Sequence, residues 1–429
     1  MDWERTRTVK EPSGESEGPA GGSPGLVVLF SAAAIPGDGI YPARAELSIG
    51  RSPDCTVFLE DAGLSRFHAV VRFDGATVTV RDAGSHNGTF RNTTRVGGEV
   101  SLGPGDVLRC GETLLTVARE VERFKGWRRW GLRGPLVGGP AMRKIADEIE
   151  AFASSGLEVL ICGESGTGKE LVANELHRRS GRAGPFVAVN CAAIPEALFE
   201  AELFGACRGA FTGAVVDRPG LLQSASGGTL LLDEVGELPE SLQAKLLRAV
   251  EERQVRPLGS RQSVPVDVRI VAASNRDLDA MQEHGKLRAD FFHRLRGALI
   301  RIPPLCERRE DIPLLVQHIL GDAASMGSAA LIERLLLHAW PGNVRELDRV
   351  LREALARARS EGEPRIELRH LRDELRPGAV APVDTFAPVR EALVRCQGNV
   401  SRAAAELGMH RAQIYTMLRE RGLRAESFR

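Results

Sequence analysis

Hydrophobic and polar residues follow three patterns along the chain, and each predicts a different structure. Over residues 25–119, short runs of Val, Leu, Phe and Thr are separated by Gly, Asp and Asn turns, as in HAVVRFDGATVTVRDAG. This is typical of an all-β sandwich. Over residues 135–375, apolar runs alternate with helical stretches, which predicts an α/β fold with a parallel sheet. Residues 311–375 predict helices only, and so does the last segment, 386–429.

The core strands of the α/β region are predicted from its four apolar runs, which cover residues 159–162, 186–189, 229–232 and 268–272. Helical stretches separate these runs, and this alternation predicts that the strands form a parallel sheet.

Three segments of low hydrophobicity precede or separate these regions. Residues 1–24 are charged and then rich in Gly, Ser and Pro, which predicts a disordered tail. Residues 120–134 are expected to form a short basic linker, and residues 376–385 a linker rich in Pro and Gly. Three domains result, and the sequence shows no internal repeat.

Composition restricts the possible partners. The 429 residues are too many for one ordinary domain. Lys plus Arg equal Asp plus Glu at 57 each, so the whole molecule has no net charge to attract nucleic acid or anionic lipid. The segment 386–429 nevertheless carries eight Arg and four Glu, without Lys or Asp. We therefore expect any DNA contact to be local and to lie at this end.

Cysteine usage and hydropathy predict the compartment. The 7 Cys residues are scattered, without CxxC pairs or His partners at zinc spacing, and the first residues show no apolar run like that of a signal peptide. No stretch approaches the roughly 18 apolar residues of a membrane helix. We expect a cytoplasmic protein with reduced thiols and no membrane partner.

The stretch VLICGESGTGKE predicts a phosphate-binding loop, because it places a Gly-rich turn between a strand and a helix starting near Leu171. Backbone N–H groups and the helix N-terminus would hold the phosphates, and Lys169 would reach their outer oxygens. A chance Gly-rich turn is the alternative, which the strand–loop–helix context disfavours. The predicted nucleotide-binding residues are Gly163, Glu164, Ser165, Gly166, Thr167, Gly168, Lys169 and Glu170.

A second motif, GGTLLLDEVGELP, places two carboxylates at the end of an apolar strand. Open α/β sheets bind ligands at this edge. Asp233 is predicted to hold Mg²⁺, and Glu234 to polarise the attacking water. Acidic pairs at strand ends are usually solvated caps, but the neighbouring phosphate loop favours a catalytic role here.

Residues 135–375 resemble the AAA+ domain of the sigma-54-dependent transcription activators, the bacterial enhancer-binding proteins. The segments that carry the resemblance stand in the family's order and are GESGTGKE, FVAVNCAAI, ELFG, GAFTGA, GGTLLLDEVGEL, LRADFFHRL, PPLCERREDIPLL and WPGNVREL. The resemblance implies a P-loop ATPase that uses ATP and Mg²⁺, with a helical lid at about 304–375. Glu170 stands where P-loops generally have Ser or Thr, and this is the family's own form of the loop.

The resemblance also implies roles for single residues. Asn190 would restrain the catalytic Glu234, Asn275 would sense the γ-phosphate, and Arg345 would contact nucleotide from the lid. Arg288 and Arg294 would be arginine fingers that reach the neighbouring subunit's site, although surface ion pairs are the ordinary role of such residues. An arginine supplied by a neighbour accelerates phosphoryl transfer by roughly 10³ to 10⁵. We therefore expect a homo-oligomer, between a dimer and the family's hexamer.

The hexapeptide GAFTGA has small residues around a Phe and a Thr, and it lies between the two nucleotide motifs. A mobile surface loop fits this composition, and a buried turn with the Phe in the core is the alternative. In the family the same residues form the tip of a loop that contacts sigma-54. The predicted sigma-54 contacts are Gly209, Ala210, Phe211, Thr212, Gly213 and Ala214.

Three features depart from the usual family pattern. Ala206, Cys207 and Arg208 precede the hexapeptide where a His-Glu-Lys type of run is usual, and Cys306 stands where Arg is common. The stretch between Ile312 and Trp340 is also shorter than usual. These differences concern the loop and the lid, and none removes a catalytic group.

The segment GNVSRAAAELGMHRAQIYTMLRERGL predicts a helix over 401–407, a turn at Gly408 and a second helix over 410–421, the spacing of a helix-turn-helix. It resembles the Fis-type domain that ends these activators, and a small dimerising hairpin is the alternative. Ala404, Leu407, Ile414 and Leu418 are expected to pack inside. The predicted DNA contacts are Arg411, Gln413, Tyr415 and Thr416.

The sandwich contains IGRSPDC, LSRFH and SHNGTF, and this ordered set resembles a forkhead-associated (FHA) domain. The resemblance implies that Arg51 and Ser65 bind a phosphothreonine phosphate, that Arg66 assists, and that Asn87 holds the peptide backbone. His68 and Gly88 would shape the loops. A sandwich that uses these residues only for its own turns is the alternative.

Together these features predict an ATP-dependent transcriptional activator that binds enhancer-like DNA and remodels the closed complex of the sigma-54 RNA polymerase holoenzyme. The FHA domain would replace the receiver domain of many relatives and would bind a phosphothreonine-containing protein or a Ser/Thr kinase. The alternative is a DNA- and phosphoprotein-binding regulator in which nucleotide controls only assembly. The intact hexapeptide favours the activator.

Overall fold

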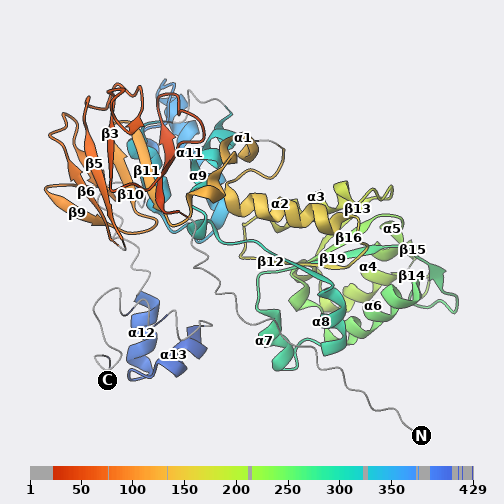
Figure 1. The fold of residues 1–429 in the computed structure, drawn as a ribbon. Helices are drawn as coiled ribbons and strands as arrows, with labels where there is room; N and C mark the ends of the chain where they lie inside the picture. The colour runs from red at the N-terminus through yellow and green to blue at the C-terminus, as the bar shows by residue number, and fades with distance from the viewer. Residues whose placement is uncertain are drawn as a thin grey trace, which may run out of the picture. The chain divides into compact units, whose positions relative to one another are not determined.

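A computed structural model describes residues 23–75, 77–132, 134–210, 215–321, 327–372, 375, 387–407, 414, 418 and 428. The chain divides between Trp127 and Arg128 into two compact units, which are described separately (Figure 1). The predicted tail up to residue 22 and the predicted linker 376–385 lie outside the described residues. None of the helices in the described part of the chain is both long and apolar enough to cross a bilayer.

The first unit is a β-sandwich of two sheets. One sheet has the order β2-β1-β11-β10-β7-β8 and the other β4-β3-β5-β6-β9, and every neighbouring pair is antiparallel except β3 and β4. The strands are β1 (Gly25–Ser31), β2 (Ile40–Pro42), β3 (Glu46–Gly50), β4 (Val57–Phe58), β5 (Ala69–Asp74), β6 (Thr77–Asp82), β7 (Thr89–Arg91), β8 (Thr94–Arg95), β9 (Glu99–Leu102), β10 (Val107–Cys110) and β11 (Thr113–Ala118).

Alternate residues of these strands form the core between the two sheets, as their period-2 pattern predicts. Leu47 and Ile49 of β3 are fully buried in the same apolar cluster as Leu26 and Val28 of β1, whereas Ser48 lies outside it. The all-β prediction for this region is therefore confirmed.

The segment predicted as a linker, 120–134, contains regular structure. The 3₁₀ helix η1 (Val121–Phe124) packs against β1 and β2, and the helix α1 (Trp127–Gly131) follows it. Trp127 is buried, and its indole N–H donates to the backbone O of Asp38 at 3.2 Å. The sequence interpretation emphasised the basic residues of this stretch and overlooked its aromatic anchors.

The second unit contains a five-stranded parallel sheet of order β13-β16-β19-β12-β20. The strands are β12 (Val159–Cys162), β13 (Phe186–Asn190), β16 (Thr229–Asp233), β19 (Arg269–Ser274) and β20 (Ala298–Arg301). The first four match the predicted apolar runs to within two residues at each end. The α/β prediction is confirmed.

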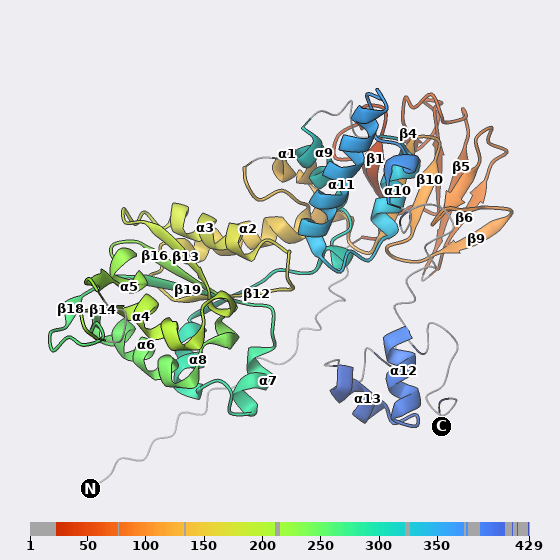
Figure 2. The ribbon, with the colours of Figure 1, turned by 180° about the vertical axis from the view of Figure 1, so that it is seen from behind.

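Helices cover both faces of this sheet, which explains why its strands are apolar throughout. Leu160, Leu230 and Ile270 belong to one buried cluster, whereas Val159 and Leu231 belong to the other. The helix α2 (Pro140–Ala153) and the helix α3 (Lys169–Arg179) lie on one face. The opposite face carries helices α4 (Glu196–Phe204), α5 (Leu221–Ser224), α6 (Glu240–Glu252) and α8 (Ala289–Leu295) (Figures 1 and 2).

Several short elements connect these layers. They are η2 (Cys191–Ala193), η3 (Val235–Glu237), α7 (Leu278–Glu283), η4 (Leu305–Glu307) and the paired strands β14 (Gly205–Ala206) with β15 (Arg218–Pro219) and β17 (Gln254–Val255) with β18 (Val264–Pro265). The β14–β15 pair flanks the hexapeptide, so the hexapeptide belongs to a hairpin loop that interrupts the α/β pattern.

The helical lid follows the sheet and contains α9 (Asp311–Leu320), α10 (Ala329–Leu337) and α11 (Asn343–Ser360). Leu347, Val350, Leu351, Ala354 and Ala358 of α11 are buried, at the spacing of three and four residues that places them on one helix face. This face packs against α9. The lid is therefore held together by an amphipathic stripe.

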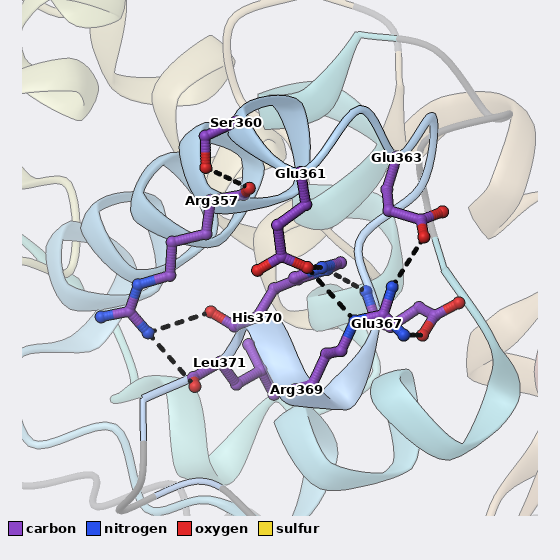
Figure 3. Close-up of polar contacts among 8 residues, drawn as sticks. All are labelled: Arg357, Ser360, Glu361, Glu363, Glu367, Arg369, His370 and Leu371. Carbon is purple, nitrogen blue, oxygen red and sulfur yellow. Dashed lines mark hydrogen bonds and ion pairs between the residues drawn. The ribbon is translucent and has the colours of Figure 1, made fainter.

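Charged side chains tie the end of α11 to η6 (Leu368–His370) (Figure 3). Arg369 forms ion pairs with Glu361, Glu363 and Glu367. His370 is buried, and its Nε2 lies 3.0 Å from a carboxylate oxygen of Glu361. This cluster fixes the path of the chain where it leaves the lid.

Two helices at the C-terminal end pack on each other, α12 (Ala387–Arg395) and α13 (Val400–Leu407). Ala404, Ile414 and Leu418 are buried, as predicted. The predicted DNA contacts Arg411, Gln413, Tyr415 and Thr416 lie outside the described residues.

Candidate functional site

The predicted phosphate loop connects β12 to α3, at the carboxyl edge of the parallel sheet. Gly166 and Gly168 have φ of +79° and +106°, which L-residues rarely adopt. The Lys169 ammonium donates to the backbone O atoms of Gly163 at 3.0 Å and Glu164 at 3.3 Å. The lysine therefore lies across the inside of the loop, where phosphate oxygens would meet it.

The predicted acidic pair lies beside this loop. Glu234 Oε1 lies 4.0 Å from Lys169 Nζ, and Asp233 Oδ1 accepts from the backbone N of Glu234 at 3.0 Å. Glu234 has φ +54°, a left-handed conformation that costs about 1–3 kcal/mol in a residue of this type. This backbone turn keeps both carboxylates at the edge of the sheet.

Asn190 ends the neighbouring strand β13, in register with Asp233. Its side-chain O accepts from the backbone N of Ala192 at 2.8 Å, which caps η2. Asn190, Asp233 and Glu234 line one pocket. Cys191, the next residue, is buried, and this burial raises the pKa of its thiol to about 12, so it is no nucleophile here.

The lid docks onto the phosphate loop through the start of α11. The backbone N atoms of Val344 and Arg345 donate to Gly166 O at 3.0 and 3.3 Å. The Arg345 guanidinium donates to Ser165 Oγ at 3.3 Å. Arg345 therefore lies beside the loop, as predicted.

Asn343 makes the closest side-chain connection between lid and loop. It is fully buried with φ +52°, and its side-chain O accepts from Leu305 N at 2.7 Å. Its side-chain N donates to the Glu164 carboxylate at 2.9 Å and to Ser165 O at 3.1 Å. The sequence analysis did not assign a role to this residue.

The loop, the acidic pair and the lid enclose a pocket of about 520 Å³, a size usual for a small-molecule site. The phosphate loop and the two carboxylates line part of it. Its lining also includes the apolar side chains of Leu136, Val137, Met142, Leu315 and Ile319. Apolar side chains suit a planar base, and the loop suits phosphates.

Five of the predicted catalytic and nucleotide-binding residues do not line this pocket: Gly163 and Glu164, which begin the phosphate loop, and Asn275, Arg288 and Arg294. Asn275 follows β19 and is exposed. Arg288 pairs with Asp290 at 2.8 Å, and Arg294 pairs with Glu158 at 2.8 Å. Both arginines are thus half-exposed and lie away from the pocket of their own chain.

The base of the hexapeptide loop rests on the β17–β18 hairpin. Cys207 N donates to Leu258 O at 2.9 Å, and Leu258 N donates to Gly205 O at 2.8 Å. Gly209 and Ala210 are described, whereas Phe211, Thr212, Gly213 and Ala214 lie outside the described residues. Val215 and Val216, which follow them, have 72% and 63% of their surface exposed. The sequence analysis did not single out these two apolar residues.

In the sandwich, the predicted phosphopeptide residues come together at one set of loops. Ser65 Oγ accepts from His86 N at 3.0 Å, and Asn87 Nδ2 donates to Gly63 O at 2.9 Å. The Arg51 backbone N donates to Ser65 O at 3.0 Å. Arg51, Arg66 and Asn87 are exposed. Neighbouring loops thus present two cations, a hydroxyl and an amide to solvent.

His68 connects these loops from inside. Its Nδ1 accepts from Ser65 N at 3.1 Å, and its Nε2 donates to Gly88 O at 3.1 Å. Burial lowers the pKa of His68 below its ordinary value, which fits the neutral tautomer that these two partners require. Asp82 accepts from the Ser85 and Thr89 side chains, and these and backbone bonds lower its pKa to about 2.

A phosphate loop on a parallel sheet, an acidic pair at the end of another strand of that sheet and a docked helical lid define an AAA+ ATPase. Family comparison gives the particular class. The sequence matches the Sigma-54 interaction domain over residues 136–301, the FHA domain over 47–111, the AAA+ ATPase lid domain over 306–385 and the bacterial regulatory protein Fis family over 389–420. The chain belongs to the sigma-54-dependent transcriptional activators.

Individual relatives agree with this assignment. The transcriptional regulatory protein GlrR of Escherichia coli K12 is 42% identical over 307 residues, which cover 68% of each chain. The regulatory protein AtoC of the same organism is 43% identical over 314 residues, 67% of this chain and 68% of its own. The crystal structure of NtrX from Brucella abortus in complex with ADP has 32% identity and a TM-score of 0.53, covering 71% of this chain and 73% of NtrX.

These findings confirm the central predictions of the sequence. The chain is an AAA+ ATPase and a sigma-54-dependent transcriptional activator, and it carries an FHA domain and a DNA-binding helix-turn-helix.

Proposed function

We propose that this activator uses ATP hydrolysis to remodel the closed complex of the sigma-54 RNA polymerase holoenzyme through its GAFTGA loop. The supporting observation is a separation of parts: the nucleotide pocket lies at the carboxyl edge of the sheet, whereas the hexapeptide falls between β14 and β15, and its two described residues, Gly209 and Ala210, do not line the pocket. Such a loop is free to contact a partner while the pocket turns over.

Within the pocket, Lys169 and the loop amides would bind the phosphates, and Glu234 would orient and polarise the attacking water. Among the described residues no group of three or more His, Cys, Asp or Glu side chains could hold a metal ion. Mg²⁺ commonly binds one or two carboxylates together with substrate phosphates, and Asp233 fits that role. The ion would neutralise phosphate charge there. Asn190 would restrain Glu234 from the adjacent strand, and Asn275 would respond to the γ-phosphate.

We propose that a neighbouring subunit completes the pocket, in a homo-oligomer up to a hexamer. Arg288 and Arg294 lie outside the pocket of their own chain and are half-exposed, so their guanidinium groups are available to another subunit once their ion pairs open. The exposed pair of Arg288 with Asp290 is worth only about 0–1 kcal/mol, so breaking it costs little, whereas the pair of Arg294 with the more buried Glu158 costs more to open.

Two substitutions test whether ATP hydrolysis in the pocket and sigma-54 contact by the GAFTGA loop are separate functions. Asp233→Asn is expected to abolish both ATP hydrolysis and transcription from a sigma-54 promoter. Thr212→Ala is expected to keep ATPase activity and lose transcription. If Thr212→Ala activated the promoter like the wild type, the proposal that the GAFTGA loop remodels the closed complex would be refuted.

We also propose that the FHA domain binds a phosphothreonine segment of a regulatory protein or Ser/Thr kinase and so controls the activator. The support is the convergence of Arg51, Ser65, Arg66 and Asn87 at one loop edge. Charge-assisted hydrogen bonds to a phosphate contribute about 1.5–3 kcal/mol each.

Binding of a phosphothreonine peptide, its unphosphorylated twin and a phosphoserine peptide would test this. The wild type is expected to prefer the first, and Arg51→Ala should lose the preference. Arg72→Ala is the matched control, because Arg72 lies on β5 and pairs with Glu46. Equal binding of the phosphorylated and unphosphorylated peptides would refute the proposal.

For DNA, we propose that Arg411, Gln413, Tyr415 and Thr416 contact an enhancer-like site, with two copies on half-sites about one helical turn apart. Arg411→Ala should weaken site-specific binding more than binding to unrelated DNA. An equal loss on both DNAs would limit Arg411 to phosphate contact.

A further inference from the structure

A buried ion pair lies at the wall of the nucleotide pocket, which Arg308 helps to line, and the function proposed above gives it no role. Arg308 and Asp311 flank the start of α9, with side chains 2% and 0% exposed. Their charged groups lie 3.2 Å apart. Burying two charges is costly unless every polar atom finds a partner, so the positions of those partners are informative.

Arg308 uses its planar guanidinium to connect separate parts of the ATPase. Its Nε donates to Pro303 O at 3.1 Å, just after β20, and one terminal N donates to Thr167 O of the phosphate loop at 3.1 Å. The other terminal N pairs with Asp311. A lysine could not make this fork, because its ammonium is a single point donor.

The bond to Thr167 has a geometric consequence for the next residue. The peptide between Thr167 and Gly168 is planar and trans, so its C=O and its N–H point in opposite directions. Holding the Thr167 carbonyl toward Arg308 therefore turns the Gly168 N–H away from Arg308. The Gly168 N–H is one of the loop amides that we predict to bind phosphate.

Asp311 holds Arg308 in place and connects it to α2. Its other carboxylate oxygen accepts from the backbone N of Gly139, the N-cap of α2. The fit is tight, since a Cβ on Gly138 would lie 2.7 Å from Asp311 Oδ2 and 2.4 Å from Met142 Cγ. Met142 of α2 lines the pocket, so Asp311 ties Arg308 to a helix that forms part of the pocket wall.

We propose that Arg308 and Asp311 are positioning residues for ATP hydrolysis: Arg308 orients the Thr167–Gly168 peptide so that its N–H faces the phosphates, and Asp311 fixes Arg308 against α2. They act on ATP through the loop. The pair thus sets phosphate affinity and leaves the chemical step to Lys169, Asp233 and Glu234.

The test uses the full chain with Arg308→Lys, at a protein concentration where assembly is complete. Arg308→Lys is expected to raise the KM for ATP about tenfold and to weaken inhibition by inorganic tripolyphosphate by a similar factor, with kcat within twofold of the wild type. The matched control is Arg309→Lys, because the Arg309 Nε donates only to Cys306 O, at 3.2 Å, and the side chain does not line the pocket. This control should change neither constant.

Three results would overturn the proposal: an unchanged KM, a lower kcat at unchanged KM, or an unchanged tripolyphosphate constant. A purely structural role would lower the melting temperature of the nucleotide-free chain and leave KM as it is. If Arg308→Lys fails to fold, Asp311→Asn decides, because it keeps the shape of the side chain and an acceptor for Gly139 N. It should raise KM about threefold, and an unchanged KM would refute the role of the pair.

Discussion

Asn343 offers a sharp test of how the lid is attached. The perturbation is a pair of substitutions, Asn343→Ala and Asn343→Gly. Both remove the same hydrogen bonds, to Leu305 N, Ser165 O and the Glu164 carboxylate. They differ in the backbone, because this residue has φ +52° and only glycine adopts that angle without strain.

The magnitudes follow from these contacts. A neutral hydrogen bond contributes about 0.5–1.5 kcal/mol, and one to a charged group about 1.5–3 kcal/mol. Glu164 is exposed, so its bond counts at the low end. Asn343→Gly should therefore lower the free energy of unfolding by roughly 3–4 kcal/mol. Asn343→Ala should cost about 1–2 kcal/mol more, because alanine is strained in the left-handed region.

The assay is hydrogen exchange of the amides in α11, which reports local opening of the lid. Global unfolding is less suitable, because a three-domain chain does not unfold in one step. Both variants should exchange faster than the wild type, and Asn343→Ala fastest. Inside an ordinary helix glycine is the worse residue by about 1 kcal/mol. If alanine proved equal to or better than glycine here, the backbone argument would be wrong, and exchange rates close to the wild type would refute the role of the side chain.

Three further predictions concern assembly and pH. Mixing Asp233→Asn subunits with Arg294→Ala subunits should restore ATPase activity that neither has alone, because an interface with the pocket of an Arg294→Ala subunit and the finger of an Asp233→Asn subunit has both parts intact; no recovery would contradict a shared site. Burial lowers the pKa of His68, so the unfolded chain binds a proton on this imidazole more readily than the folded chain does. The free energy of unfolding of the sandwich, measured in urea, should therefore decrease as the pH falls below about 6.5, and His68→Asn should remove this pH dependence. Burial raises the pKa of Asp311 above its ordinary value although the pairing with Arg308 opposes the shift, so stability should fall as the pH rises from about 4 through the folded pKa; Asp311→Asn should abolish the effect, and an unchanged slope would show that the carboxyl titrates normally.

The phosphate loop and the acidic pair could be predicted from the sequence because their chemistry depends on local order. A strand, a Gly-rich turn and a helix follow one another between residues 159 and 179, and the carboxylates directly follow another apolar strand. Parallel strands then bring both motifs to the same edge of the sheet. The FHA loops were predictable for the same reason, since Arg51, Ser65 and Asn87 each stand beside a recognisable turn.

Asn343 and Arg308 could not be assigned in this way, because their partners are distant in sequence. Asn343 meets Glu164 across 179 residues, and Arg308 meets Thr167 across 141. The hydrophobic periodicity of the sequence does not reveal contacts between residues so far apart. Both residues look like ordinary polar positions near helix starts. Their roles come from burial, which only packing decides.

The aromatic segment after the sandwich was missed for a related reason. Trp127 stands among basic residues, which suggested an exposed connection. Its indole instead fills a buried position against the sandwich and finds the Asp38 carbonyl. A single large side chain outweighed the average polarity of its neighbours.

The distance along the chain between Glu164 and Asn343 also matters during synthesis. At about 5–20 residues per second, a ribosome needs roughly 10–35 s to make the 179 residues that separate them. For that time the nascent phosphate loop exists without the side chain that later anchors it. A newly made chain therefore completes its nucleotide pocket only late in translation, after the lid has emerged from the exit tunnel.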